Sequence, residues 1–154
     1  MNRFIALLPL LALTACPDPD PKETGSCTDM GCEDGFYVAF EKSTWDAGQY
    51  LFEVDVDGNV YTCQVTIPLG TDGTDGCPDT MIMVEQSGSE LPVDQQSIPG
   101  LWVNSVQAAA VTITVSLNGA ELGSQDFVPA YETLEPNGAA CGPVCQFDSA
   151  SMGL

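Results

Sequence analysis

The stretch QYLFEVDVDGNVYTCQV, residues 49–65, decides the fold. Apolar side chains alternate with polar ones on both sides of Asp57-Gly58, and this period of two is typical of a half-buried strand. Because glycine tolerates a positive φ and aspartate often does, the dipeptide predicts a two-residue hairpin turn. Counting outward from the turn gives three apolar pairs: Val54 with Tyr61, Phe52 with Cys63, and Tyr50 with Val65. All six side chains then share one face, which indicates an antiparallel hairpin with one buried side.

A second hairpin is predicted from VTITVSLNGAEL, residues 111–122. Its apolar residues again occupy alternate positions, and Asn118-Gly119 is a strong signal for a tight hairpin turn. A simple count back from this turn pairs Val115 with Leu122 and leaves Phe127 on the wrong face. Since a glycine inside a strand often marks a bulge, we expect one near Gly123-Ser124 that brings Phe127 opposite Val111.

Shorter alternating segments predict further strands at Phe36–Glu41, Met81–Gln86, Gly100–Asn104 and Gln125–Tyr131. Seven or so short strands separated by turns, with no helical spacing, indicate an all-β chain. We therefore expect a single small antiparallel β-sandwich, immunoglobulin-like in the broad sense. The two tryptophans, Trp45 and Trp102, are interpreted as core or sheet-edge packing rather than as a binding platform.

The N-terminus carries export signals. Arg3 precedes a ten-residue apolar run, residues 4–13, which is too short to span a bilayer but suits the hydrophobic region of a signal peptide. The run ends in Leu13-Thr14-Ala15-Cys16, which resembles the lipobox of bacterial lipoproteins. The resemblance implies that residues 1–15 are removed and that Cys16 receives diacylglycerol and, on its amine, a fatty acid such as palmitate. Several acyl chains would anchor the protein stably to a membrane of the cell envelope; which membrane stays open.

Residues 16–26 are expected to form a stalk behind the lipid. Alternating prolines at Pro17, Pro19 and Pro21 favour an extended path of about 3.1 Å per residue. Residues 27–154 are then left as the single β-domain. Its layout, with Asp-Gly turns and a cysteine-rich end, is similar to that of small cysteine-rich envelope lipoproteins, a loose resemblance that implies no activity.

The charge balance excludes one class of partner. The chain has 22 acidic residues against three basic ones, and its net charge is −19 at pH 7. Nucleic-acid binding requires lysine and arginine to displace counterions from phosphates, so no nucleic-acid partner is expected. The expected partners are the membrane, through the N-terminal lipid, and an envelope protein.

Six cysteines remain if Cys16 carries lipid, and an even number in an exported chain predicts three disulfides. A Cys63–Cys77 bond would close a loop of about 15 residues. The other four form two clusters near the ends of the domain: Cys27 with Cys32, and Cys141 with Cys145. We expect bonds between the clusters; pairing within each cluster is the alternative.

The sequence contains few of the residue patterns that catalysis or metal binding requires. There is no histidine, which removes the common nucleophile-base arrangements, and the cysteine spacings fit neither zinc nor thioredoxin-like motifs well. No cofactor is expected. Weak calcium candidates are the pairs Asp55 with Asp57 and Asp72 with Asp75, but the first departs from the EF-hand pattern and both fit ordinary turns.

The sequence therefore predicts a non-catalytic binding or structural module. A calcium-dependent adhesion module is the alternative, and a small hydrolase using paired carboxylates ranks third. The polar segments Thr71–Gly76 and Gln86–Ser97 are the expected contact surfaces, because loops commonly carry binding residues.

Overall fold

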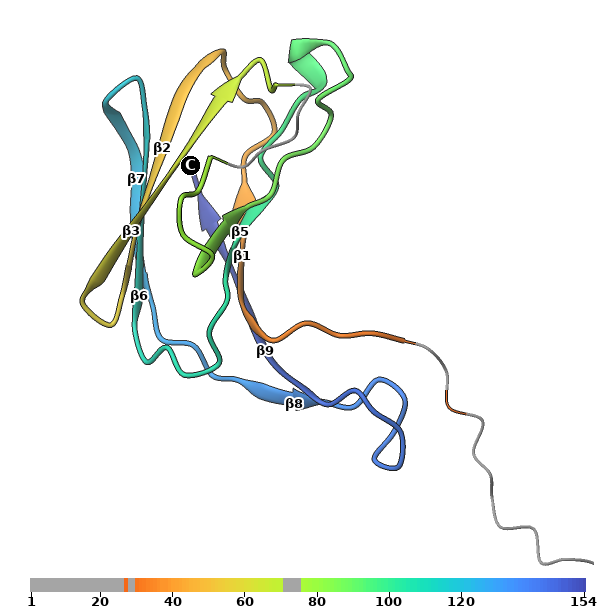
Figure 1. Cartoon of the computed structure of the whole chain (residues 1–154). Helices are drawn as coiled ribbons and strands as arrows, with labels where there is room; N and C mark the ends of the chain where they lie inside the picture. The colour runs from red at the N-terminus through yellow and green to blue at the C-terminus, as the bar shows by residue number, and fades with distance from the viewer. Residues whose placement is uncertain (1–26, 28–29, 71–75) are drawn as a thin grey trace, which may run out of the picture.

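The computed structural model describes residue 27, residues 30–70 and residues 76–154. Within them the chain forms nine β-strands and one single-turn 3-10 helix (Figure 1). In chain order these are β1 Gly35–Glu41, β2 Gly48–Val56, β3 Asn59–Ile67, β4 Ile82–Val84, η1 Val93–Gln95, β5 Gly100–Val103, β6 Val111–Leu117, β7 Ala120–Phe127, β8 Glu132–Leu134 and β9 Cys145–Gly153. No helix in this part of the chain has the length and apolar character needed to cross a membrane.

The strands form two sheets that face each other (Figure 1). One has five strands in the order β4-β5-β1-β9-β8, and the other has four in the order β3-β2-β6-β7. All pairs between named strands are antiparallel except β1 with β9. The all-β sandwich expected from the sequence is therefore confirmed, while the parallel pair was not foreseen.

The hairpin of β2 and β3 has the register counted from the sequence. Val54 lies opposite Tyr61, Phe52 opposite Cys63, and Tyr50 opposite Val65. Asp57 and Gly58 have φ of 51° and 85°, as a primed turn requires. Turn chemistry and hydrophobic alternation favour the same register, and this agreement made the hairpin predictable.

The hairpin of β6 and β7 contains the expected bulge, one residue earlier than predicted. Ser116 lies opposite Glu121, but Val115 lies opposite Gly123, so Leu122 is the extra residue. Because the shift moves all later residues to the other face, Phe127 lies opposite Val111 and is buried.

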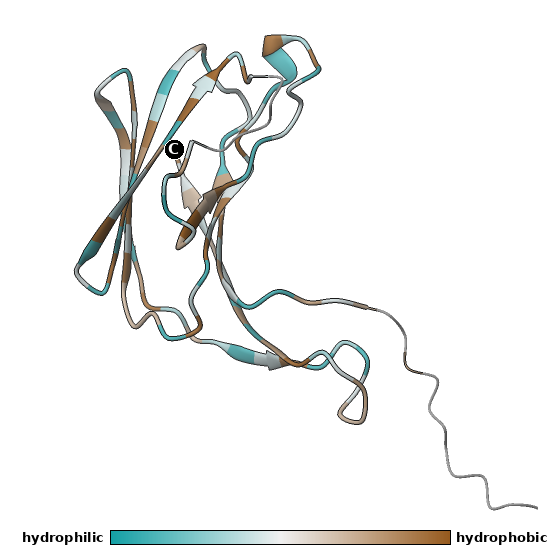
Figure 2. Ribbon diagram, in the orientation of Figure 1, coloured by the Kyte–Doolittle hydropathy of each residue, from teal (hydrophilic) through white to brown (hydrophobic). Residues whose placement is uncertain are grey.

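The hydrophobic core lies between the sheets. Figure 2 shows hydrophobic and hydrophilic segments following one another along the strands of both sheets, as expected when each strand has one buried face. The largest fully buried side chains come from both sheets and the connections between them: Tyr50, Phe36, Phe52, Ile67, Ile82, Ile98, Leu101, Ile113 and Met152. Burying one such side chain contributes about 1.5–3 kcal/mol, so this core is the main source of stability.

Several strand predictions needed correction. The strand predicted at Met81–Gln86 shortens to Ile82–Val84, and the one at Gly100–Asn104 ends at Val103. The strand expected to reach Tyr131 ends at Phe127, two residues before Pro129, which has no N–H to donate. Strands β8 and β9 were not predicted. The β9 sequence CQFDSASMG lacks regular alternation, and only its two ends include fully buried residues.

Two disulfides join the N-terminal part of the domain to its C-terminal part. Cys27 is bonded to Cys141 and Cys32 to Cys145, with Cα atoms 5.7 and 6.0 Å apart. The third bond joins Cys63 to Cys77, with Cα atoms 4.3 Å apart. The structure thus contains the loop-closing bond and the bonds between clusters that were expected from the sequence.

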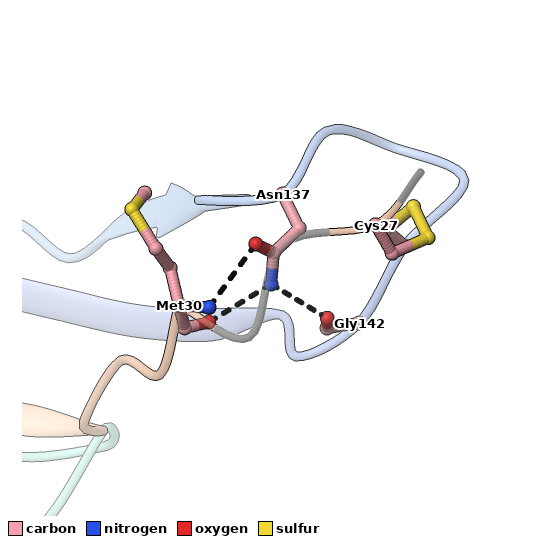
Figure 3. Close-up of a disulfide and its surroundings, with 5 residues drawn as sticks. Cys27, Met30, Asn137 and Gly142 are labelled. Carbon is pink, nitrogen blue, oxygen red and sulfur yellow. Dashed lines mark hydrogen bonds between the residues drawn. A yellow bond between two sulfur atoms is a disulfide. The ribbon is translucent and has the colours of Figure 1, made fainter. Parts of the chain in front are cut away.

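Asn137 reinforces the junction of the two ends beside the first disulfide (Figure 3). Its side-chain oxygen accepts a hydrogen bond from the Met30 N–H at 3.3 Å. Its side-chain nitrogen donates to the carbonyls of Met30 and Gly142, both at 2.8 Å. The chain therefore enters the domain at a point fixed both covalently and by hydrogen bonds.

Candidate functional site

The outer face of the five-stranded sheet carries a row of large side chains. Trp102 on β5 lies directly opposite Met83 on β4 and directly opposite Tyr37 on β1. Their chain neighbours on the same strands point inward and are buried, so these three residues point away from the core. Tyr37 and Trp102 are partly exposed and Met83 is exposed. The ring centroids of Tyr37 and Trp102 are 4.9 Å apart, at an interplanar angle of 45°.

Phe147 on β9 extends this row. It pairs with Gly35 and therefore shares the outer face with Tyr37, two residues further along β1. The centroids of Trp102 and Phe147 are 5.8 Å apart, although β5 and β9 lie on opposite sides of β1. We call Tyr37, Met83, Trp102 and Phe147 together the aromatic face.

Glu85 borders the aromatic face. The Tyr37 hydroxyl donates a 2.8 Å hydrogen bond to one Glu85 carboxylate oxygen. Gly100 leaves the space that this arrangement needs, because a Cβ there would overlap the Tyr37 hydroxyl. Burial, followed by the hydrogen bond and negative charge of Glu85, raises the pKa of Tyr37 to about 12. The hydroxyl is therefore a donor at neutral pH.

Further carboxylates stand on the same side of the sheet. Glu132 on β8 lies opposite Phe147, and Glu41 at the end of β1 accepts a 2.7 Å hydrogen bond from the Ser151 hydroxyl. Among the described residues Lys42 is the single lysine or arginine, and its amine lies over the Trp45 ring, 5.9 Å from the centroid. The aromatic face is thus bordered by negative charge.

The two tryptophans have different roles. Trp45 is buried in the core against Phe40 and Tyr50, as expected from the sequence. Trp102 is neither a core residue nor on an edge strand, because β5 lies between β4 and β1 and the side chain points outward. The prediction for Trp102 was therefore wrong. The alternation of β5, with Leu101 and Val103 inward, is the signal that places it outside.

The calcium candidates within the described residues accept hydrogen bonds from backbone N–H groups. One Asp55 carboxylate oxygen accepts a hydrogen bond from Gly58 N–H at 2.6 Å. Asp57 accepts from Ala109 and Ala110 N–H at 3.0 and 2.9 Å. In residues 27, 30–70 and 76–154, no three His, Cys, Asp or Glu side chains gather in a group that could hold a metal ion. Asp72 and Asp75 lie outside the described residues.

Of the two segments expected to form contact surfaces, the structure describes Gln86–Ser97 in full but only the last residue of Thr71–Gly76. Residues 71–75 lie outside the described part. The Gln86–Ser97 segment folds back on itself through a bridge between Ser87 and Ser97. Gln96 is buried there, where it accepts from Leu69 N–H at 2.7 Å and donates to Leu91 C=O at 3.0 Å. The end of this segment is therefore part of the scaffold.

The remaining predicted site residues are cysteines. All six cysteines of the described residues are in disulfides, so none offers a thiol there. Cys16 lies outside the described residues. Comparisons of the chain with protein-family models, curated proteins and solved structures find no match.

The aromatic face has the chemistry of a binding surface. Tyrosine and tryptophan offer large contact areas at low entropic cost, and they are enriched among residues that dominate binding energies. The Tyr37 hydroxyl and the Glu85 carboxylate add a fixed polar group at the border of the rings. Sequence reasoning placed no binding residues here, because the row is assembled from four strands that are distant in the chain.

Proposed function

We propose that this protein is a lipid-anchored, non-catalytic binding module of the cell envelope, and that the aromatic face is its contact surface. The observation that carries the proposal is the row of exposed or partly exposed side chains, Tyr37, Met83, Trp102 and Phe147, on the outer side of a sheet whose inner side already forms the core. A sandwich does not need large aromatic residues on this side for its own packing, because small polar residues occupy such positions in many strands.

The rigid support of the face favours binding. Three rings lie on β1, β5 and β9, which are adjacent strands in the order β5-β1-β9. Their spacing is set by backbone pairing, and their mutual contacts restrict rotation. A partner would therefore meet a surface that needs little ordering on association, which improves affinity.

Export and anchoring are supported by the N-terminal sequence. The Leu13-Thr14-Ala15-Cys16 motif follows a positively charged start and an apolar run. The three disulfides fit an oxidising compartment outside the cytoplasm. Metabolic labelling with a fatty-acid analogue tests this part: the wild-type protein incorporates the label, and the Cys16→Ala variant does not. Labelling of Cys16→Ala at the wild-type level would contradict lipid attachment at this residue.

The binding role is tested with the intact lipidated protein. Quantitative affinity purification from the native envelope compares wild type, Trp102→Ala and Leu51→Ala. Leu51 is a matched control because it is a partly buried residue on the outer side of the four-stranded sheet, opposite Gln64 and Ser116. We expect one or more envelope proteins to be enriched by wild type and Leu51→Ala and depleted with Trp102→Ala. Equal recovery with all three would contradict the proposal.

The non-catalytic part has its own test. The purified protein is assayed in broad hydrolase and thiol-oxidoreductase screens, where we expect no turnover. Reproducible turnover that is lost on a single Asp or Glu substitution, with the fold intact by circular dichroism, would refute a purely binding role and support a hydrolase that uses carboxylates.

A further inference from the structure

We propose that the aromatic face binds a cationic segment of a partner protein, with an arginine side chain stacked on Trp102 or Tyr37 and paired with Glu85. This inference rests on the proposed function and specifies the chemistry of the partner. It follows from three features of the described residues: the charge around the face, the open oxygen of Glu85, and the arrangement of the rings.

The negative charge around the aromatic face favours a positively charged partner. Glu41, Glu85 and Glu132 are exposed on or beside the outer side of the five-stranded sheet. The whole chain has 22 acidic residues and three basic ones, and Lys42, the single cation of the described part, lies over Trp45. An anionic segment would be repelled here, whereas a cationic one gains affinity and a faster encounter rate.

Glu85 provides a specific point of attachment. One of its carboxylate oxygens accepts the Tyr37 hydroxyl at 2.8 Å, which fixes the group at the border of the rings. No described residue donates to the other oxygen. A carboxylate can accept several hydrogen bonds, so this oxygen remains available to a guanidinium, which is planar and has five N–H donors.

The rings provide the second half of the site. Tyr37 and Trp102 are partly exposed, with ring centroids 4.9 Å apart and an interplanar angle of 45°. Glu85 is hydrogen-bonded through its carboxylate to Tyr37 and through its backbone N–H to Gly100, two residues before Trp102 on β5. A guanidinium placed over one ring face is attracted by the ring quadrupole while its edge reaches the carboxylate. Lysine can satisfy either contact but lacks the flat fork that satisfies both, so arginine is preferred.

A neutral oligosaccharide is the competing ligand class, because sugar rings also stack on aromatic side chains. Nothing in a neutral sugar is favoured by the Glu85 carboxylate beside the rings, whereas a cation gains from it. The observations therefore favour the cationic segment, and the oligosaccharide becomes one arm of the test.

The experiment measures affinities for the lipidated protein in detergent micelles at physiological ionic strength, about 0.15 M. The probes are a peptide of alternating glycine and arginine, its lysine and glutamine counterparts, and an uncharged N-acetylglucosamine oligosaccharide. We expect the arginine peptide to bind more tightly than the lysine peptide, and the glutamine peptide and the sugar not to bind.

Matched variants distinguish binding at Glu85 and Trp102 from general electrostatic attraction to an acidic protein. Glu85→Gln and Glu53→Gln remove the same charge, but Glu53 lies on the outer side of the four-stranded sheet, opposite Thr62 and Thr114. We expect Glu85→Gln to weaken arginine-peptide binding about fivefold or more and Glu53→Gln to change it less than about twofold. Trp102→Ala is expected to weaken binding about threefold or more, with Leu51→Ala as its control.

Each contrary result overturns the inference. Equal weakening by Glu85→Gln and Glu53→Gln would mean that the peptide responds to net charge alone. Binding of the sugar at Trp102 without arginine-peptide binding would replace the cationic segment by a glycan while leaving the contact role of the face intact. Absence of binding by every probe would remove the cationic partner, and the affinity purification with Trp102→Ala separately decides whether the face binds a protein.

Discussion

The ring centroids of Trp102 and Phe147 are 5.8 Å apart, although their strands are separated by β1. Strands two apart in a sheet lie about 10 Å from each other, so the two rings lean toward one another across the intervening strand. Phe147 pairs directly with Gly35 on that strand, and Trp102 pairs with Tyr37, two residues further along it. The contact between the two rings therefore requires the β5-β1-β9 strand order.

Replacement of Gly35 by alanine is expected to destabilise the domain by about 2 kcal/mol or more. Gly35 has a φ of 138°, and a Cβ there would lie 2.6 Å from the Val103 carbonyl oxygen, so the substitution adds backbone strain and a clash. Urea denaturation measures the loss. Gly153→Ala is the control, because a Cβ at residue 153 would have no other atom within 4 Å. Equal stabilities of the two variants would contradict the close approach at Gly35.

The paired terminal disulfides are expected to stabilise the domain non-additively. Cys27–Cys141 and Cys32–Cys145 are adjacent, so with one bond intact the other closes a ring of only about 11 residues. Removing either bond by paired Cys→Ser substitutions should cost about 3 kcal/mol, whereas removing both should cost about 7–8 kcal/mol, because a loop of more than 100 residues is then released. Denaturant unfolding checks this; a double loss equal to the sum of the single losses would show that the bonds act independently.

Ionisation of Tyr37 is expected to destabilise the fold at high pH. The folded state raises the pKa of Tyr37 from 10.0 to about 12, so its stabilising contribution is complete below pH 10 and is lost as the pH rises toward 12. Ultraviolet absorbance titration detects tyrosinate formation, and Tyr37→Phe identifies the Tyr37 step. In Glu85→Gln this step should move to lower pH, since a negative charge that opposes ionisation is removed. An unchanged titration would show that Glu85 does not influence the hydroxyl.

Asp57 is expected to stabilise the sandwich through a contact between its hairpin and a distant loop. Its carboxylate accepts from Ala109 and Ala110 N–H, more than 50 residues away along the chain. Asp57→Ala should cost about 2 kcal/mol or more, since it removes charge-assisted hydrogen bonds and places alanine at a φ of 51°. Asp57→Asn keeps an acceptor oxygen and tolerance of positive φ, and should cost less than about 1 kcal/mol by urea denaturation. Equal losses would assign the effect to the charge alone.

The sequence predicted those parts of the fold where local signals agree. At residues 49–65 the turn dipeptide, the alternation and the paired apolar residues all specify one register, and the structure has that register. The same logic located the bulge of the second hairpin to within one residue, because Phe127 had to reach the core. Loop closure and the clustering of cysteines led to the three disulfides.

The parts that depend on distant pairing could not be predicted in this way. Strand β9 pairs in parallel with β1, more than 100 residues away, and its serines and aspartate give no regular alternation. The aromatic face includes one residue from β9 and three from β1, β4 and β5, so it exists only once that pairing is known. Trp102 was assigned to packing because a lone tryptophan in a sequence does not reveal its neighbours.

The central claim, that the aromatic face contacts a protein partner in the envelope, is tested most directly by photo-crosslinking in intact cells. A photoreactive phenylalanine derivative replaces Met83, which is exposed at the border of the face, or Leu51 on the opposite sheet. We predict a discrete crosslinked protein from position 83 that is absent from position 51 and is lost when Trp102→Ala is added. No crosslink from position 83, or the same products from both positions, would contradict the claim.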